Sequence, residues 1–241
     1  MKLGCLPYLN VKPLVYPFEH GELPRGWELV YAPPSELATM LARGKIAAAP
    51  VSSFATFIYP EFDICPGICI AAHGPVQSVL MLSKKHIEDI HTVALDTSSL
   101  SGANMLKIVL DEACDVRPEF VRLPPNPVSE ILDRADAALV IGDAAMTCAK
   151  DGLIVFDLAD EWVKLTGLPA VFAVWAGLGL TGEVVEALHD AKGKGMTKIE
   201  EIAREQSVEL GLSYEVCHDY LSRVMVYDLG EQETLALETF K

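Results

Sequence analysis

The sequence has no hydrophobic run long enough to cross a membrane. Its longest apolar stretches, such as residues 170–180, reach only about half of the ~20 residues that a membrane-spanning helix needs. The opening residues MKLGC contain neither an extended basic region nor an apolar segment, so we expect no signal peptide. These absences favour a cytoplasmic protein without a membrane partner.

Positive charge is scarce. The chain has 19 Lys and Arg residues against 34 Asp and Glu residues, which gives a formal net charge of -15. The imbalance lies beyond residue 80, because residues 1–80 hold five basic and six acidic side chains whereas residues 81–241 hold fourteen and twenty-eight. The electric field of this negative charge repels nucleic acid and anionic lipid. We therefore expect no nucleic-acid partner, and local groups must hold any small anionic ligand.

Motifs for metals, cofactors and common nucleophiles are also missing. The sequence contains no GxSxG, HExxH or P-loop, and no GxGxxG follows a predicted strand. The six cysteines lie mostly in apolar surroundings, as reduced thiols do. Cys65 and Cys69 form a lone CxxxC, whereas structural zinc needs four ligands. We expect neither a metal nor a cofactor.

Strand-like and helix-like segments alternate along the chain. With 241 residues, 51% of them hydrophobic, the chain is long enough for a large core. The predicted strands are residues 3–6, 27–31, 46–50, 67–72, 76–83, 92–95, 119–123, 137–141 and 170–176. The predicted helices are residues 11–18, 34–43, 52–58, 102–114, 127–134, 143–150, most of 181–210, and 214–224. The pattern predicts an α/β fold with mostly parallel sheets flanked by helices.

The strand-like segments within residues 67–84 have no helix between them, as if the chain leaves one lobe there and begins another. Residues 170–176 then carry it back. We expect residues 1–80 and 174–241 to form the first lobe, residues 81–173 to form the second, and a ligand cleft to lie between them. Both a monomer and a homodimer are compatible with the sequence.

Four strand-to-helix junctions are rich in small hydrogen-bonding residues. They are Pro7-Tyr8-Leu9-Asn10, Pro50-Val51-Ser52-Ser53, the stretch from Asp96 to Gly102, and Ile141-Gly142-Asp143-Ala144. In open α/β sheets these junctions gather at the carboxyl ends of strands, where ligands bind. Helix N-termini offer unpaired N–H groups, and serine hydroxyls add donors without bulk. The combination predicts a site for a carboxylate or a phosphate.

The same residues have ordinary structural interpretations. Asn10 and Ser99 are both good helix N-caps, and Asp143 can stabilise the start of its own helix. Pro7 and Pro13 favour a ligand role for Asn10, because they stiffen its junction and hold the amide over the cleft. The residues alone leave both interpretations open.

Longer stretches carry a resemblance over nearly the whole chain. They are PYLNVKPL at 7–14, ELATMLARGKIAAAPVSS at 36–53, GPVQSVLMLSKK at 74–85, LDTSSLSGANMLKIVL at 95–110, ADAALVIGDAA at 135–145, EWVKLTGLPAVFAVWA at 161–176 and YDLGEQETLALETF at 227–240. Together they resemble the chorismate dehydratase family of the futalosine route to menaquinone. The resemblance implies a two-lobed fold like that of type II periplasmic binding proteins, used as a hydro-lyase. The implied reaction removes water from chorismate and yields 3-[(1-carboxyvinyl)oxy]benzoate.

The resemblance also implies a set of site residues. The family's functional motifs fall on Asn10, Ser52, Ser78, Ser99, Ser101 and Gly142. We expect Asn10 at the reacting ring, and Ser99, Ser101 and the N–H of Gly102 on one carboxylate, with Ser52 and Ser53 helping from the other lobe. Tyr8 either contacts the ligand or only packs. Where relatives often carry arginine and threonine, this chain has Leu100 and Ser101, which leaves that contact open.

The general base is not evident from the motifs. Asp143 is the nearest motif carboxylate, and a carboxylate of the substrate itself is the alternative. Two other functions are compatible with the same architecture: the dihydroxynaphthoate synthase of the same pathway, and a small-anion binding protein without chemistry. The PYLN start and the SSLSG junction favour the dehydratase.

Overall fold

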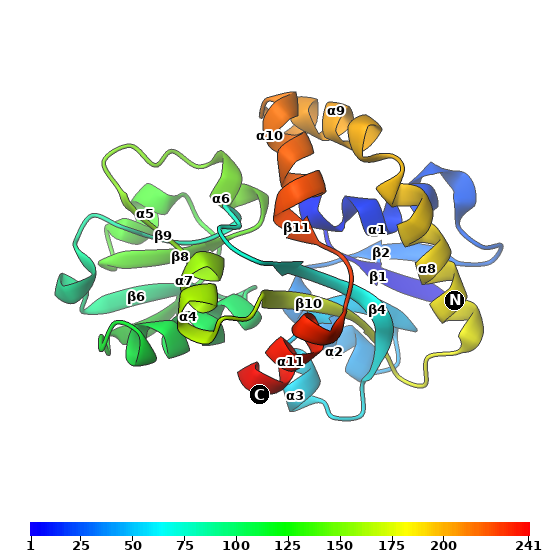
Figure 1. Cartoon of the computed structure of the whole chain (residues 1–241), viewed down its shortest axis with the longest axis horizontal. Helices are drawn as coiled ribbons and strands as arrows, with labels where there is room; N and C mark the ends of the chain where they lie inside the picture. The colour runs from blue at the N-terminus through cyan, green and yellow to red at the C-terminus, as the bar shows by residue number, and fades with distance from the viewer.

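The computed structural model describes all residues 1–241, which form two lobes, each built on one β-sheet (Figure 1). The strand order is β11-β4-β10-β3-β1-β2 in the first sheet and β7-β6-β8-β5-β9 in the second. Helices pack against both sheets, so the two-lobed α/β prediction is confirmed. No helix is both long enough and apolar enough to span a membrane.

The first lobe contains both ends of the chain. Its strands are β1 (Lys2–Cys5), β2 (Glu28–Tyr31), β3 (Ala48–Ser52), β4 (Asp63–Ala72), β10 (Ala170–Gly177) and β11 (Met225–Val226). Its helices are η1 (Leu9–Val11), α1 (Lys12–Pro17), η2 (Phe18–Glu22), α2 (Pro34–Ala42), α3 (Ala55–Ile58), α8 (Gly182–Met196), α9 (Ile199–Leu210), α10 (Tyr214–Asp219), η4 (Tyr220–Val224) and α11 (Glu231–Phe240).

The second lobe comes from the middle of the chain. Its strands are β5 (Val79–Ser83), β6 (Thr92–Asp96), β7 (Glu119–Leu123), β8 (Ala137–Ile141) and β9 (Ile154–Asp157). Its helices are η3 (Ile87–Asp89), α4 (Ser101–Glu112), α5 (Val128–Leu132), α6 (Asp143–Thr147) and α7 (Leu158–Thr166). The chain enters this lobe between β4 and β5 and leaves it between α7 and β10. The expected lobe ends at residues 80 and 174 lie inside β5 and β10.

Both sheets are mixed, which corrects the expectation of mostly parallel sheets. β1 pairs in parallel with β2 and β3, and β6 pairs in parallel with β7 and β8. β10 runs antiparallel to β3 and β4, and β5 runs antiparallel to β8 and β9. The antiparallel strands include β4, which leads the chain out to the other lobe, and β5 and β10, each of which is the first strand after the chain crosses between the lobes. They are not joined to their neighbours by the helical crossovers that make strands parallel.

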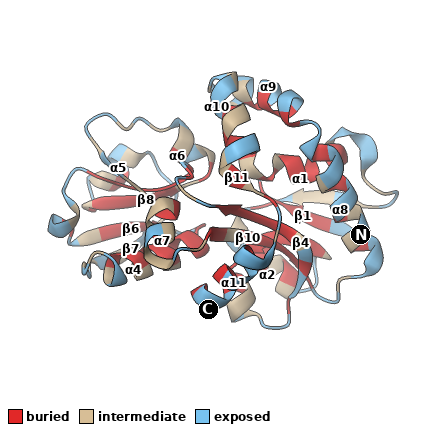
Figure 2. Cartoon of the chain, in the orientation of Figure 1, coloured by how far each residue is buried: buried red, intermediate tan, exposed pale blue.

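The inner strands of both sheets are largely buried, and the inward faces of the helices complete the core (Figure 2). β3 and β5 are buried at every residue, which matches their apolar sequences AAPVS and VLMLS. One cluster of buried apolar side chains includes residues of both lobes, such as Leu3 in β1 and Leu106 in α4. The lobes therefore share packed surface around the cleft.

Candidate active site

A small cavity lies between the lobes, at the ends of the predicted junctions. It encloses about 70 Å³. Its lining combines residues from both lobes: Leu6, Tyr8, Asn10, Pro34, Ser52, Ile70, Ser78, Val79, Ser98, Ser99, Leu100, Ser101, Gly102, Ile141, Gly142, Phe172 and Ala173. All four junctions reach it. Eight of the ten expected site residues line it, and the two that do not, Ser53 and Asp143, lie behind the lining.

Asn10 presents a buried amide to this cavity. It lies within η1, the single 3-10 turn after β1, whereas the N-cap of α1 is Val11. The Asn10 Oδ1 atom is buried and has no hydrogen-bond partner within the protein. The N-cap interpretation of Asn10 is therefore wrong. An unpaired buried amide oxygen is costly, and a ligand that donates to it would remove the cost.

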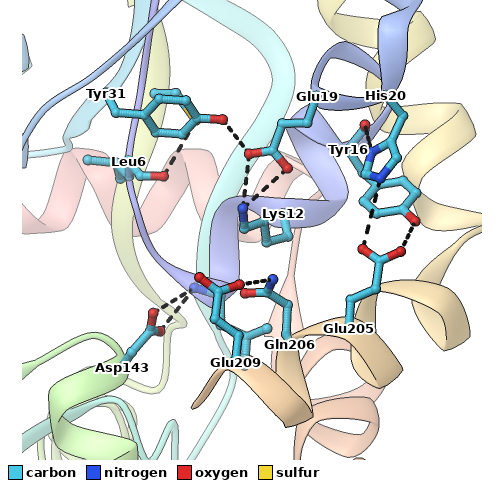
Figure 3. A network of polar contacts seen from close by, with 12 residues as sticks. Leu6, Lys12, Tyr16, Glu19, His20, Tyr31, Asp143, Glu205, Gln206 and Glu209 are labelled. Carbon is cyan, nitrogen blue, oxygen red and sulfur yellow. Dashed lines mark hydrogen bonds and ion pairs between the residues drawn. The ribbon is translucent and has the colours of Figure 1, made fainter.

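Asp143 holds the turn that carries Asn10. The Leu9 N–H donates to both carboxylate oxygens of Asp143, at 3.0 and 3.3 Å, and this contact joins η1 of the first lobe to α6 of the second (Figure 3). Burial raises the pKa of Asp143, and the Leu9 N–H and the charge of Lys12 offset this only in part. The carboxylate thus faces the backbone of η1 and is not part of the cavity lining.

A network of polar contacts fixes the helix that follows this turn (Figure 3). Lys12 pairs with Glu19 at 2.9 Å, and the Tyr31 hydroxyl also donates to Glu19. The side chains of Lys12 and Glu19 are only 18% and 16% exposed, so water screens this pair less than a surface pair. The Tyr16 hydroxyl donates to Glu205 on α9 at 2.8 Å. α1 is therefore anchored on two sides, and η1 at its start has little freedom.

Three of the expected serines bond to one another across the cleft. The Ser101 hydroxyl donates to the carbonyl of Phe172 at 2.7 Å, and the Ser53 hydroxyl donates to the carbonyl of Val171 at 2.6 Å. Ser52 lies 2.6 Å from Ser101. Because a hydroxyl has one proton and that of Ser101 is committed, Ser52 is the donor in this pair. All three protons are used within the protein, and the cluster ties α4 to β3 and β10.

The start of α4 keeps its donors free. Its first backbone hydrogen bond runs from Asn104 to the carbonyl of Leu100, so the N–H groups of residues 101–103 have no backbone partner. The Ser99 hydroxyl makes no hydrogen bond within the protein either. The N-cap of α4 is Leu100, so the N-cap interpretation of Ser99 is wrong. Gly102 fits closely here, since a Cβ on it would lie 2.8 Å from the Ser99 Oγ.

The junction after β8 requires glycine. Gly142 has φ 63° and ψ −147°, a conformation that residues with a side chain rarely adopt. A Cβ there would lie 3.0 Å from the ring of Tyr8. Burial raises the pKa of Tyr8, so its hydroxyl stays protonated at the cavity wall. The Gly142 N–H also donates to the carbonyl of Ser78 at 2.7 Å, which fixes the start of β5.

The lining as a whole is neutral. It contains no Lys, Arg, His, Asp or Glu. Apolar walls come from residues such as Ile70, Val79, Ile141 and Phe172, and the polar positions are an amide, hydroxyls and free N–H groups. Such a cavity suits a ligand with an apolar ring and anionic ends. The expected site residues did not include Phe172 or Ser98, although the aromatic Phe172 was expected either to pack in the core or to line the cleft wall. Phe172 lies within the TGLPAVFAVWA stretch, and Ser98 lies within the serine-rich junction.

Comparison with protein families and curated proteins gives a consistent result. A family described as menaquinone biosynthesis matches residues 1–241. A chorismate dehydratase of Thermus thermophilus is 29% identical over 259 residues, covering 99% of this chain and 93% of that protein. A chorismate dehydratase of Campylobacter jejuni is 27% identical, covering 100% of this chain and 96% of that protein.

Solved structures resemble the fold at lower identity. A protein of Archaeoglobus fulgidus has a TM-score of 0.82 and 20% identity, covering 99% of this chain and 94% of that one. A Candida albicans protein described as having the periplasmic binding protein fold has a TM-score of 0.68 and 14% identity, covering 100% and 88%. Both similarities concern the fold alone.

Proposed function

Because the chain belongs to the menaquinone biosynthesis family, we propose that it is a chorismate dehydratase, a carbon–oxygen lyase that converts chorismate to 3-[(1-carboxyvinyl)oxy]benzoate. The observation that carries the proposal is the neutral cavity in which free donors and the unpaired Asn10 oxygen lie beside apolar walls. Two relatives named chorismate dehydratase, aligned over almost their full length, support it. We further propose a cytoplasmic location.

The cavity's donors fit a substrate with two carboxylates. One carboxylate would bind at the start of α4, where Ser99 and the N–H groups of residues 101–103 are free. The second would bind near Ser78, the ring hydroxyl would donate to the unpaired Asn10 Oδ1, and the ring would lie against Phe172 and its apolar neighbours. Each hydrogen bond to a charged group contributes roughly 1.5–3 kcal/mol. Four such bonds offset the several kcal/mol that desolvation of a carboxylate costs.

The reaction requires mainly that the site orient the substrate and direct its proton transfers. A C–H bond and a C–O bond of the cyclohexadiene ring break, and the electron pair of the C–H bond completes the aromatic ring. The ring proton passes to a base, and the hydroxyl leaves as water after receiving a proton. The reaction is redox-neutral, so it needs no electron acceptor. The site's contribution is to hold the ring and its leaving group in the reactive orientation.

We propose that a carboxylate of the substrate itself is the base. No ionisable carboxylate or imidazole lines the cavity, and Asp143 is bonded to the Leu9 N–H. Asp143→Asn keeps an acceptor for that N–H but removes the basic carboxylate. We expect this variant to keep turnover within about tenfold of the wild type. Loss of turnover with unchanged chorismate binding would identify Asp143 as the base.

Incubation of the purified protein with chorismate tests the function. We expect mass analysis to show loss of one water, and the ultraviolet spectrum to change to that of a benzoate. Heat-denatured protein is the control. Binding of chorismate without turnover would instead support a binding protein. Turnover of cyclic dehypoxanthinyl futalosine alone would support the dihydroxynaphthoate synthase.

A further inference from the structure

Tyr220 is a buried tyrosine that contacts the site from behind. It is the first residue of η4 and is 2% exposed. Its hydroxyl donates to the Oγ of Ser78 at 2.7 Å. Ser78 is itself 1% exposed and lines the cavity from the segment just before β5. The contact therefore connects the C-terminal part of the first lobe to a cavity residue 142 positions away in the sequence.

The direction of this hydrogen bond determines what Ser78 can do. A serine hydroxyl has one proton and two acceptor sites. Since Tyr220 supplies the proton of the shared bond, the Ser78 proton stays available, and no group of the protein accepts it. The backbone of Ser78 is held at the same time, because its carbonyl accepts the Gly142 N–H at 2.7 Å. With backbone and oxygen both fixed, the remaining Ser78 proton points away from Tyr220.

Tyr220 keeps this donor role over a wide pH range. Burial raises the pKa of Tyr220, and the negative charges of Asp143 and Asp157 raise it further. The contacts of Tyr220 with Ser78 and with the Asn10 amide oppose this shift in part. The neutral phenol is therefore the form present at neutral pH, and it also lies close to Asn10.

We propose that Tyr220 is a positioning residue for the dehydration, which locks the Ser78 hydroxyl so that its proton is directed at a substrate oxygen in the cavity. This inference rests on the proposed function. Tyr220 does not line the cavity, so it acts through Ser78. Without the Tyr220 hydroxyl, the Ser78 hydroxyl can rotate toward other acceptors and is no longer held for the substrate.

The test is Tyr220→Phe, with Tyr227→Phe as a matched control. Both rings are buried, at 2% and 3% exposure, but the Tyr227 hydroxyl has no hydrogen-bond partner. We expect Tyr220→Phe to lower kcat for chorismate 10- to 100-fold and to change KM less than threefold, since misplacing a reacting group by about 1 Å costs up to about 100-fold. We expect Tyr227→Phe to stay within twofold of the wild type in kcat.

A double-mutant cycle distinguishes positioning from general stability. In a Ser78→Ala background, Tyr220→Phe should lower kcat by less than a further twofold, because its target is already gone. A full loss in that background, or a Tyr220→Phe variant as active as the wild type, overturns the inference. If the wild type itself does not dehydrate chorismate, the proposed function fails instead. The two failures are therefore separate results.

Discussion

Asn10 contributes an unpaired buried oxygen to the site, which destabilises the protein without its ligand. Its Oδ1 is buried without a partner, and such an atom costs roughly 1–3 kcal/mol relative to a paired one. Two prolines and the Asp143 carboxylate hold the turn on which Asn10 lies, so the backbone that carries the amide is fixed. A buried group that destabilises the empty protein is expected where the ligand supplies the missing partner.

Replacing Asn10 separates function from stability. We expect Asn10→Ala to lower kcat for chorismate by about 100-fold or more, and to leave the free energy of unfolding unchanged or slightly increased, because the unpaired oxygen is removed. Enzyme assays and urea denaturation check the two parts. Asn10→Asp keeps the shape but loses the amide donors, and it should be similarly inactive. Retained activity with a stability loss above 2 kcal/mol would make Asn10 a purely structural residue.

Asp143 makes stability depend on pH with a definite sign. Burial raises its folded pKa above the ordinary value of 3.8, so its stabilising contribution is complete below that value and is lost as the pH rises through the folded pKa. Asp143→Asn is neutral at every pH. We therefore expect it to be at least as stable as the wild type at pH 7, with a smaller difference at low pH. Thermal unfolding at both pH values measures this, and greater relative stability of the wild type at pH 7 would contradict it.

At the scale of elements, the junctions could be predicted better than the contacts between them. Alternating apolar segments gave β7 and β8 with correct bounds, and the serine-rich stretch after β6 predicted a helix start near Gly102. Sequence could not show that Ser101 bonds to Ser52, because that contact joins residues 49 positions apart. Tyr220 gave no signal for the same reason, since its role depends on Ser78 in a distant segment.

The missed elements have local causes. β9 has exposed residues at Ile154 and Val155 and lies at a sheet edge, so it lacks the buried pattern of the other strands. β11 has only two residues. α7 begins at Leu158 directly after β9, so no loop of turn residues precedes its N-cap Asp157 in the sequence. The antiparallel sense of β10 depends on the path between lobes and not on its own residues.

The Asp157 carboxylate links the start of α7 to the segment that crosses between the lobes. Its carboxylate accepts the N–H groups of residues 159 and 160 at the start of α7, and those of Val76 and Gln77 on the crossing segment. Gln77 has φ 62°, which is unfavourable for a residue with a side chain. Asp157 thus stabilises both the helix start and a strained turn.

Removing this carboxylate should destabilise the fold clearly. We expect Asp157→Ala to lower the free energy of unfolding by about 3 kcal/mol, the sum expected for a lost N-cap and lost bonds to a charged group. Urea denaturation provides the measurement. Asp160→Ala is the control, because Asp160 pairs with the exposed Lys164, and we expect a loss below about 1 kcal/mol. Equal losses for the two variants would show that the crossing contacts contribute little.

At the scale of the whole molecule, the lobes are held in a closed arrangement. The serine cluster and the contact of Asp143 with Leu9 both join them. α11 also packs against both lobes. The ring centroid of its Phe240 lies 5.3 Å from that of Trp162 in the second lobe and 5.5 Å from that of Phe54 in the first. The cavity of about 70 Å³ is smaller than the roughly 150 Å³ that admits benzene. Entry of chorismate therefore requires the lobes to open or the lining to move.

A covalent link across the cleft tests whether opening is needed. The Oγ atoms of Ser52 and Ser101 lie 2.6 Å apart, close to the roughly 2.05 Å of a disulfide bond. We expect the double variant Ser52→Cys and Ser101→Cys, once oxidised, to turn over chorismate at least tenfold more slowly than the same protein after reduction. Ser52→Cys alone is the control for oxidation of native thiols. Equal rates in both redox forms would mean that the ligand enters without separation of the lobes.

The structure of the protein with the reaction product bound tests the central claim most directly. If neutral donors at the strand ends hold the substrate, one carboxylate of the product will lie within hydrogen-bond distance of Ser99 and the N–H groups of residues 101–103. The Asn10 amide will then face the ring. A product bound outside the cavity, with these groups turned to bulk water, would contradict the account.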